Sequence, residues 1–328
     1  MSRLLATIFA FALPLPAFAL CSGDRFETYL TPQELVEINE TVAATPYASG
    51  NYWQAQKDSH TVTILGTMHL PDPRHAATLD VALPRLTAAD LLLVEATQQD
   101  QADIQTYMAQ NPDMLVITDG PTLPDLLSDT TWDAISEAAE DRGLPSFMAA
   151  KMQPWFLALT LAIPTCAATK MMSGEGGLDA LLMDQAATLD IPVAPLEPWQ
   201  DMFALLTSGT FDEQVDALRM GLLEPDMSDA LMVTLVEDYF AGQTAHAWQM
   251  SYYTQQFLPD LDPAVFEEQM AMVEEMLLTQ RNANWIPVIE KAAADNANVF
   301  VAFGAAHLIG EKGVLRLLEN EGWTISPL

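Results

Sequence analysis

The chain has 328 residues, half of them hydrophobic, and 13 basic against 45 acidic side chains give it a net charge of −32. Nucleic acids and anionic membrane surfaces both need a basic protein face, so we expect neither as a partner. The acidic residues are spread along the chain, and no linker, repeat or low-complexity segment divides it. A single α/β domain over residues 20–328 is therefore the simplest expectation, although the length alone would permit two domains.

Residues 1–19 have the pattern of a secretory signal peptide, with Arg3, an apolar stretch and an Ala17-Phe18-Ala19 cleavage site. The apolar stretch is too short and too interrupted by proline to span a bilayer. We expect a secreted or periplasmic protein that is not inserted in the membrane after cleavage. Cys21 raises the alternative of a lipoprotein, but Leu20 stands where a lipoprotein signal normally has a small residue, which favours ordinary cleavage after Ala19.

The sequence has two cysteines, Cys21 and Cys166. Export to an oxidising compartment allows them to pair, and we favour a disulfide between them. The alternative is two separate thiols, with Cys166 in a core. Metal binding by two such distant cysteines is not expected.

A hairpin is predicted over residues 51–65, because two alternating, strand-like runs flank Lys57-Asp58-Ser59. Its second strand leads directly into Gly66-Thr67-Met68-His69. A glycine lets the backbone turn sharply where a Cβ would clash, so we expect His69 at the C-terminal edge of a sheet. His60 begins the same strand at its other end and is expected on the surface.

The same order of features returns near the C-terminus. An apolar strand is predicted over Val299–Phe303, Gly304-Ala305-Ala306-His307 follows it, and a helical pattern begins at Val314. A lone histidine in such a turn often only caps a helix. Two Gly-x-x-His segments, each after a predicted strand, favour a functional role for both histidines.

Two further predicted strands end in a carboxylate. The apolar run of residues 89–94 ends at Glu95, and that of residues 191–196 ends at Glu197. Runs of this kind suit central parallel strands, whose C-terminal ends converge at one edge of a sheet. Although a loop glutamate is usually only solvated, we expect Glu95 near both histidines. Glu197 either faces the site or pairs with a cation, and Asp179 either belongs to the site or caps a helix.

Helices are predicted between these strands. Residues 98–163 are helical with breaks, and residues 152–163 are apolar all round, which indicates a core or a groove. Residues about 199–280 form a predicted helical insertion that caps the sheet. Its aromatic residues, Trp248, Tyr252, Tyr253 and Phe257, form either its core or the wall of a substrate groove, and His246 is interpreted as structural. The methionines show no Met-x-x-Met spacing, so packing is favoured over haem or copper binding.

Several segments resemble the TraB/PrgY/GumN family, which includes the Tiki-type proteases. The resemblance runs from about Cys21 to the end and is most specific at GTMH, LLLVEAT, Gly177-Leu178-Asp179, PVAPLE, Gln280-Arg281-Asn282 and GAAHLIGEKGVLRLLENEGW. It implies that Glu95 and Arg281-Asn282 are motif positions, and that the protein is a metal-dependent protease of unusual class. With the strand pattern, it indicates an α/β fold: a mostly parallel, mixed sheet flanked by helices.

Two histidines and one glutamate can hold Zn²⁺, Mn²⁺ or Co²⁺ with positions left open for water. Such an ion acidifies its water and polarises a carbonyl. We therefore expect an exported metal-dependent peptidase acting on peptides or proteins, with His69, Glu95 and His307 as ligands and catalytic residues. Arg281 would stabilise the developing oxyanion, unless it only forms a salt bridge.

Two other functions stay open. In the first, related to erythromycin-esterase-like enzymes, a histidine acts as general base on water without a metal. In the second, the protein is not an enzyme and binds haem or a peptide signal. The sequence has no H-E-x-x-H, G-x-S-x-G or Walker motif, so the common hydrolase mechanisms are absent.

Overall fold

The computed structural model describes residues 21–172, 174–258 and 261–328, so the signal peptide predicted at 1–19 lies outside the described residues. The strands within these ranges form one six-stranded sheet in the order β4-β3-β5-β2-β1-β6. The strands are β1 (Tyr52–Lys57), β2 (His60–Thr67), β3 (Leu91–Val94), β4 (Val193–Pro195), β5 (Asn298–Gly304) and β6 (Thr324–Pro327).

The four strands predicted to share one edge are neighbours in the sheet. β4, β3, β5 and β2 run parallel, whereas β1 and β6 add an antiparallel edge. The hairpin predicted over residues 51–65 is present as β1 and β2, but β2 continues two residues further, to Thr67, which pairs with Gly304 of β5. The predicted α/β fold with a mostly parallel, mixed sheet is confirmed.

Helices cover both faces of the sheet, as the alternation of its buried residues requires. On one face Ile64 and Val301 pack with α15 and α16, and on the other Leu65 and Phe300 pack with α2 and α9. The bounds of these helices are α2 (His75–Thr87), α9 (Leu178–Thr188), α15 (Gln280–Asp295) and α16 (Val314–Asn320).

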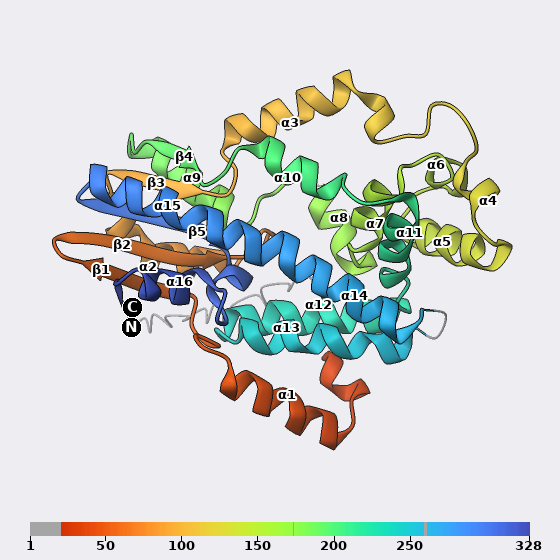
Figure 1. Ribbon diagram of the computed structural model, residues 1–328, viewed down its shortest axis with the longest axis horizontal. Helices are drawn as coiled ribbons and strands as arrows, with labels where there is room; N and C mark the ends of the chain where they lie inside the picture. Colours follow the sequence, from red (N-terminus) through yellow and green to blue (C-terminus); the bar gives the residue numbers. More distant parts are fainter. Residues whose placement is uncertain (1–20, 173, 259–260) are drawn as a thin grey trace, which may run out of the picture.

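The other helices gather mostly to one side of the sheet, away from the β1–β2 turn (Figure 1). They are α1 (Pro32–Ala44), α3 (Gln98–Gln110), α4 (Leu123–Leu126), α5 (Asp129–Asp141), α6 (Ser146–Ala149), α7 (Pro154–Leu161), α8 (Thr165–Met172), α10 (Trp199–Leu206), α11 (Phe211–Met220), α12 (Pro225–Phe240), α13 (Thr244–Tyr252) and α14 (Pro263–Glu274). Short 3-10 turns are η1 (Phe26–Tyr29), η2 (Pro112–Met114), η3 (Tyr253–Phe257) and η5 (Ala305–Leu308), and η4 (Glu275–Thr279) is a π-helix between α14 and α15.

This helical layer takes residues from two parts of the chain. Leu157 and Leu161 of α7 share a buried cluster with Leu218 of α11. The layer therefore includes α3–α8 as well as the segment about 199–280 that the sequence singles out as an insertion.

Cys21 and Cys166 form a disulfide with a Cα–Cα distance of 5.3 Å, which confirms the predicted pairing. The bond fastens the start of the described chain to α8 and fits an extracellular protein. None of the described helices is long and apolar enough to cross a membrane.

Candidate functional site at the strand ends

The C-terminal ends of three adjacent strands bring His69, Glu95 and His307 together. Nε2 of His69 lies 3.7 Å from Oε1 of Glu95, and Nε2 of His307 lies 3.9 Å from the same oxygen. The order β3-β5-β2 within the sheet places these residues side by side, as expected for the ends of parallel strands. We call these three residues, with Arg281, the strand-end cluster.

Glu95 is the centre of this cluster and both of its oxygens are held. Oε1 accepts a hydrogen bond from the backbone N–H of Gly304 at 2.7 Å, and Oε2 accepts one from Nη2 of Arg281 at 2.5 Å. Burial alone favours the protonated acid, but the surrounding His307, Arg281 and His69 together with the Gly304 amide lower the pKa of Glu95 to about 2. The carboxylate is therefore ionised at neutral pH.

His69 is oriented by Asp179 on α9. Nδ1 of His69 lies 3.1 Å from Oδ1 of Asp179, and because a carboxylate only accepts, Nδ1 carries the proton and Nε2 is directed to Glu95. The bond to Asp179, helped by the charge of Glu95, raises the pKa of His69 to about 9. Water at the exposed side of the ring screens part of this attraction, since 59% of the His69 side chain is exposed.

The approach of α9 to His69 depends on a glycine. Gly177 precedes the first residue of α9, and a Cβ there would lie 2.2 Å from the carbonyl oxygen of Met68 and 2.6 Å from Cα of His69. The same carbonyl accepts a hydrogen bond from the N–H of Leu178. Asp179 therefore reaches His69 because residue 177 has no side chain, and it is not the N-cap of α9.

His307 is buried and oriented by Asn282 on α15. Nδ1 of His307 lies 2.6 Å from Oδ1 of Asn282, whose Nδ2 donates to the carbonyl of Lys312 at 2.9 Å. The amide of Asn282 is thereby fixed with its oxygen toward the ring, so Nδ1 of His307 carries the proton. Burial lowers the pKa of His307 to about 3, and the ring is neutral.

Arg281 lies among the groups of the strand-end cluster. Its five N–H groups face Oε2 of Glu95, Oε1 of Glu197, the carbonyl of Leu277 and Nε2 of His307. Glu197 also accepts from the indole N–H of Trp285 at 3.1 Å. All donors of the guanidinium are thus used within the protein, and Arg281 anchors two glutamates whose side chains are only 16% and 9% exposed. Glu197 pairs with this cation, which was one of the two roles predicted for it.

The glycines of the two Gly-x-x-His segments have different functions. A Cβ on Gly66 would lie 2.6 Å from Cδ1 of Leu308 and 2.9 Å from Cα of Ala305, so this glycine permits close packing of η5 on β2. A Cβ on Gly304 would lie 3.4 Å from Oε1 of Glu95 and 3.5 Å from Nε2 of His69. Gly304 therefore keeps the middle of the cluster free of side-chain atoms.

A pocket of about 550 Å³ opens beside the strand ends. His69, Glu95 and Asp179 line it together with Thr67 of β2 and Asp184 of α9. A group bound in this pocket would contact His69 and Glu95 directly.

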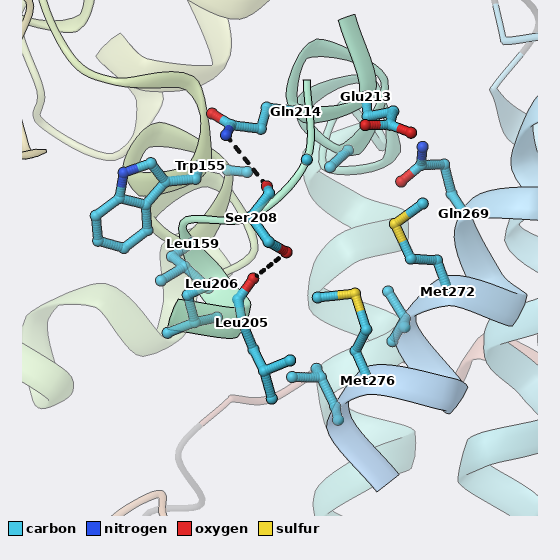
Figure 2. A pocket seen from close by; sticks show the side chains of 15 residues that line it. Trp155, Leu159, Leu205, Leu206, Ser208, Glu213, Gln214, Gln269, Met272 and Met276 are labelled. Atoms are coloured by element: carbon cyan, nitrogen blue, oxygen red, sulfur yellow. Dashed lines mark hydrogen bonds between the residues drawn. The ribbon is translucent and has the colours of Figure 1, made fainter. Parts of the chain in front are cut away.

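A second, apolar pocket lies among α7, α10, α11, α14 and η4, where Trp155, Met272 and Met276 line it (Figure 2). Residues 152–163 were predicted to form a core or a groove, and α7 contributes to both. Leu277 connects this pocket to the strand-end cluster, because it lines the pocket and its carbonyl binds Arg281.

Of the four aromatic residues of the insertion, Trp248 lines a third pocket, near Asn282, and Tyr253 and Phe257 pack on a buried cluster.

The strand-end donors suit a divalent metal. Around an ion with bonds of about 2.1 Å, tetrahedral ligand atoms stand about 3.4 Å apart. The two pairs that include Oε1 of Glu95, at 3.7 and 3.9 Å, are slightly wider, whereas the nitrogens of His69 and His307 stand more than 4.8 Å apart. At His307 the lone pair that a metal would use accepts a long contact of 3.3 Å from Arg281. His69, Glu95 and His307 could therefore hold an ion once that contact yields and the two imidazole rings move closer together.

A second group of possible ligands was not predicted from the sequence. Among the described residues, Glu27, Asp238 and His246 place their ligand atoms within 4.8 Å of one another, closer together than the strand-end donors. We call them, with Arg25, the N-terminal cluster. Arg25 donates to both carboxylates, and Nδ1 of His246 lies 2.6 Å from Oδ2 of Asp238. Glu27 and His246 lie far apart in the sequence, and no local motif marks them.

Comparison with protein-family models identifies one match, described as the TraB/PrgY/gumN family, over residues 51–327. A comparison with curated proteins found no significant match. The matched region includes all three strand ends, Asp179 and Arg281, whereas Arg25 and Glu27 of the N-terminal cluster precede it. Since the family model covers most of the sequence, the chain belongs to the TraB/PrgY/gumN family.

Proposed function

We propose that the protein is an exported, metal-dependent hydrolase that cleaves peptides or proteins at the strand-end cluster. One observation carries the proposal: both imidazoles hold a protonated Nδ1 against an oxygen and direct Nε2 toward the same oxygen of Glu95. Metal-binding histidines typically have this arrangement, with the second nitrogen fixed by a carboxylate or carbonyl. Export agrees with the disulfide and with the N-terminal sequence.

Each neighbouring residue has a defined task in this proposal. Asp179 and Asn282 fix the tautomers of His69 and His307, and Arg281 keeps Glu95 ionised and in place. A bound Mn²⁺, Co²⁺ or Zn²⁺ would supply an acidified water and polarise the scissile carbonyl. In the hydrolysis, the water oxygen bonds to the acyl carbon, the C–N bond breaks, and a proton from the water reaches the leaving amine. The pocket beside His69 would admit the substrate.

The test combines metal analysis with a peptide assay. The purified protein is analysed for bound metal, and a fluorogenic peptide library is incubated with Mn²⁺, Co²⁺ or Zn²⁺ and with a chelator. Cleavage that needs metal and is lost in His69→Ala and His307→Ala supports the proposal. Full activity in the double variant would refute the site. A Soret band in the purified protein would favour haem binding instead.

A metal-free hydrolase is a second candidate, and one observation favours it. At neutral pH His69 is protonated, since its pKa is raised to about 9, whereas His307 is neutral because burial lowers its pKa to about 3. An acid and a neutral imidazole therefore both face Oε1 of Glu95. Cleavage that survives chelation but is lost in His69→Ala would select this mechanism.

A further inference from the structure

Thr67 is a buried residue of the first Gly-x-x-His segment. It is the last residue of β2, its side chain is only 2% exposed, and it lines the pocket that contains His69 and Glu95. No described protein group hydrogen-bonds to its hydroxyl. An unpaired buried hydroxyl is costly in a folded protein, and most such groups have a partner. The hydroxyl itself is closed to solvent, but the residue lines the pocket, so a ligand or water that enters there is the natural source of a partner.

The register of the sheet shows where this hydroxyl belongs. Thr67 is the parallel partner of Gly304, and paired residues of neighbouring strands present their side chains to the same face. A Cβ on Gly304 would lie within 3.7 Å of Oε1 of Glu95, Nε2 of His69 and Cδ2 of His307. Thr67 therefore stands beside the space that Gly304 keeps free at the centre of the cluster.

We propose that Thr67 is a positioning residue that holds the water consumed in hydrolysis. The water donates one hydrogen bond to Oγ1 of Thr67 and another to the carboxylate of Glu95, which leaves an oxygen lone pair directed at the substrate. A hydroxyl suits this task because it accepts without carrying a charge, next to a carboxylate and two imidazoles. This inference rests on the proposed hydrolase function.

Two substitutions separate the hydroxyl from the shape of the side chain. Thr67→Val removes the hydroxyl and keeps the branched shape, whereas Thr67→Ser keeps the hydroxyl. With the fluorogenic peptide library and Mn²⁺, Thr67→Val should lower kcat by about 10- to 100-fold with little change in KM, because the water loses its orientation. Thr67→Ser should stay within a few-fold of wild type. Turnover of Thr67→Val at the wild-type rate would overturn the proposal.

Thr234 gives a matched control for folding. Its hydroxyl is fully buried but has two protein partners: it accepts from the N–H of Phe26 at 2.8 Å and donates to Glu27 at 3.0 Å. Thr234→Val should lower Tm by several degrees, whereas Thr67→Val, which loses no protein partner, should change Tm by less than about 2 °C. A large fall in Tm for Thr67→Val would show a structural role and contradict the proposal.

A crystal structure with Mn²⁺ gives a readout that does not depend on activity. The wild-type and Thr67→Ser proteins should show a water about 2.5–3.0 Å from Oγ of residue 67 and within reach of Glu95, and Thr67→Val should lack it. Absence of this water from the wild-type protein would overturn the proposal. If the wild type cleaves no peptide, the proposed function fails, and the crystal structure still decides whether Thr67 binds water.

Discussion

Two clusters in this molecule combine acids, histidine and one arginine, and they differ in what their polar atoms face. In the N-terminal cluster every carboxylate oxygen has a protein donor: Arg25 binds Glu27 and Asp238, Thr234 binds the second oxygen of Glu27, and His246 binds the second oxygen of Asp238. Each of the four carboxylate oxygens therefore has its own donor, and the cluster forms a closed ion-paired network.

In the strand-end cluster, two imidazole nitrogens face the same carboxylate oxygen. Asp179 and Asn282 hold the protons of both histidines on Nδ1, so each neutral ring directs a lone pair toward Oε1 of Glu95. Such an arrangement needs a cation between the atoms. At His69 a second proton meets this need, which is why Asp179 and Glu95 raise the pKa of the ring. Close spacing of ligand types therefore does not by itself indicate a metal site. In the strand-end cluster the nitrogens that face Glu95 are matched only by a second proton at His69 and a long contact of 3.3 Å from Arg281 at His307, and a metal ion could replace both.

The largest effect is expected from the arginine of the strand-end cluster. Arg281→Ala would leave Glu95 and Glu197 buried without their cation, at a cost of about 3–5 kcal/mol in the free energy of unfolding. Arg25→Ala should cost less, since Arg25 is partly exposed and His246 still binds Asp238. Urea unfolding of both variants measures the difference. Equal stability of Arg281→Ala and wild type would show that Arg281 is not the anchor of these glutamates.

Asp179 should affect metal binding through His69. Asp179→Ala removes the acceptor that fixes Nδ1, and loss of such a partner typically lowers metal affinity by about 10- to 100-fold. Isothermal titration with Mn²⁺ or Zn²⁺ measures the change. Asp184→Ala, on the same helix and in the same pocket but not bonded to His69, is the matched control and should retain most of the affinity. Equal losses in both variants would point to pocket charge rather than to ligand orientation.

Substitutions at the two glycines of the Gly-x-x-His segments should affect different properties, protein stability at Gly66 and metal affinity at Gly304. Gly66→Ala would place a Cβ 2.9 Å from the backbone of Ala305, and overpacking of this kind costs about 1–3 kcal/mol. Gly304→Ala meets its neighbours at ordinary contact distances, so the protein should fold with nearly unchanged Tm while losing metal affinity. Thermal melts and metal titration on both variants test this contrast, which fails if Gly304→Ala binds metal normally.

The smallest expected effect is on the pH dependence of stability. The pKa of His69 is raised to about 9 in the folded protein from an ordinary value near 6.5. Its contribution to the stability of the metal-free protein is therefore fully present below about pH 6.5 and is lost as the pH rises toward 9. Tm should decline over this range in the wild type, and the decline should be weaker in Asp179→Ala. An identical pH profile for the two proteins would show that His69 is not held by Asp179.

The sequence predicted the strand ends better than the partners of the site. The apolar, β-branched pattern of residues 61–65 and 299–303 predicts strands, so the positions of His69 and His307 follow from local features. The sharp turns expected at the two glycines are absent, because Gly66 and Gly304 are the last or next-to-last residues of the strands themselves. The partners of Arg281 do not follow from local features, because Glu197 comes from the loop after β4 and the carbonyl of Leu277 comes from the π-helix η4. The sequence allowed a salt bridge for Arg281 but could not show that all five donors are engaged.

The N-terminal cluster was missed for the same physical reason. His246 was interpreted as structural, which its bond to Asp238 supports, but its neighbours Arg25 and Glu27 come from the other end of the chain. They are brought to α12 by η1, a short element whose docking depends on tertiary contacts rather than on a sequence pattern.

The most direct test of the central claim is metal affinity in three single variants. Isothermal titration with Mn²⁺, Co²⁺ or Zn²⁺ compares His69→Ala, His307→Ala and His246→Ala with wild type. Because removal of a ligand costs more than loss of its supporting partner, the first two should bind at least about 100-fold more weakly, and His246→Ala should bind as wild type does. Loss of affinity in His246→Ala, with His69→Ala and His307→Ala unchanged, would place the metal in the N-terminal cluster and contradict the account.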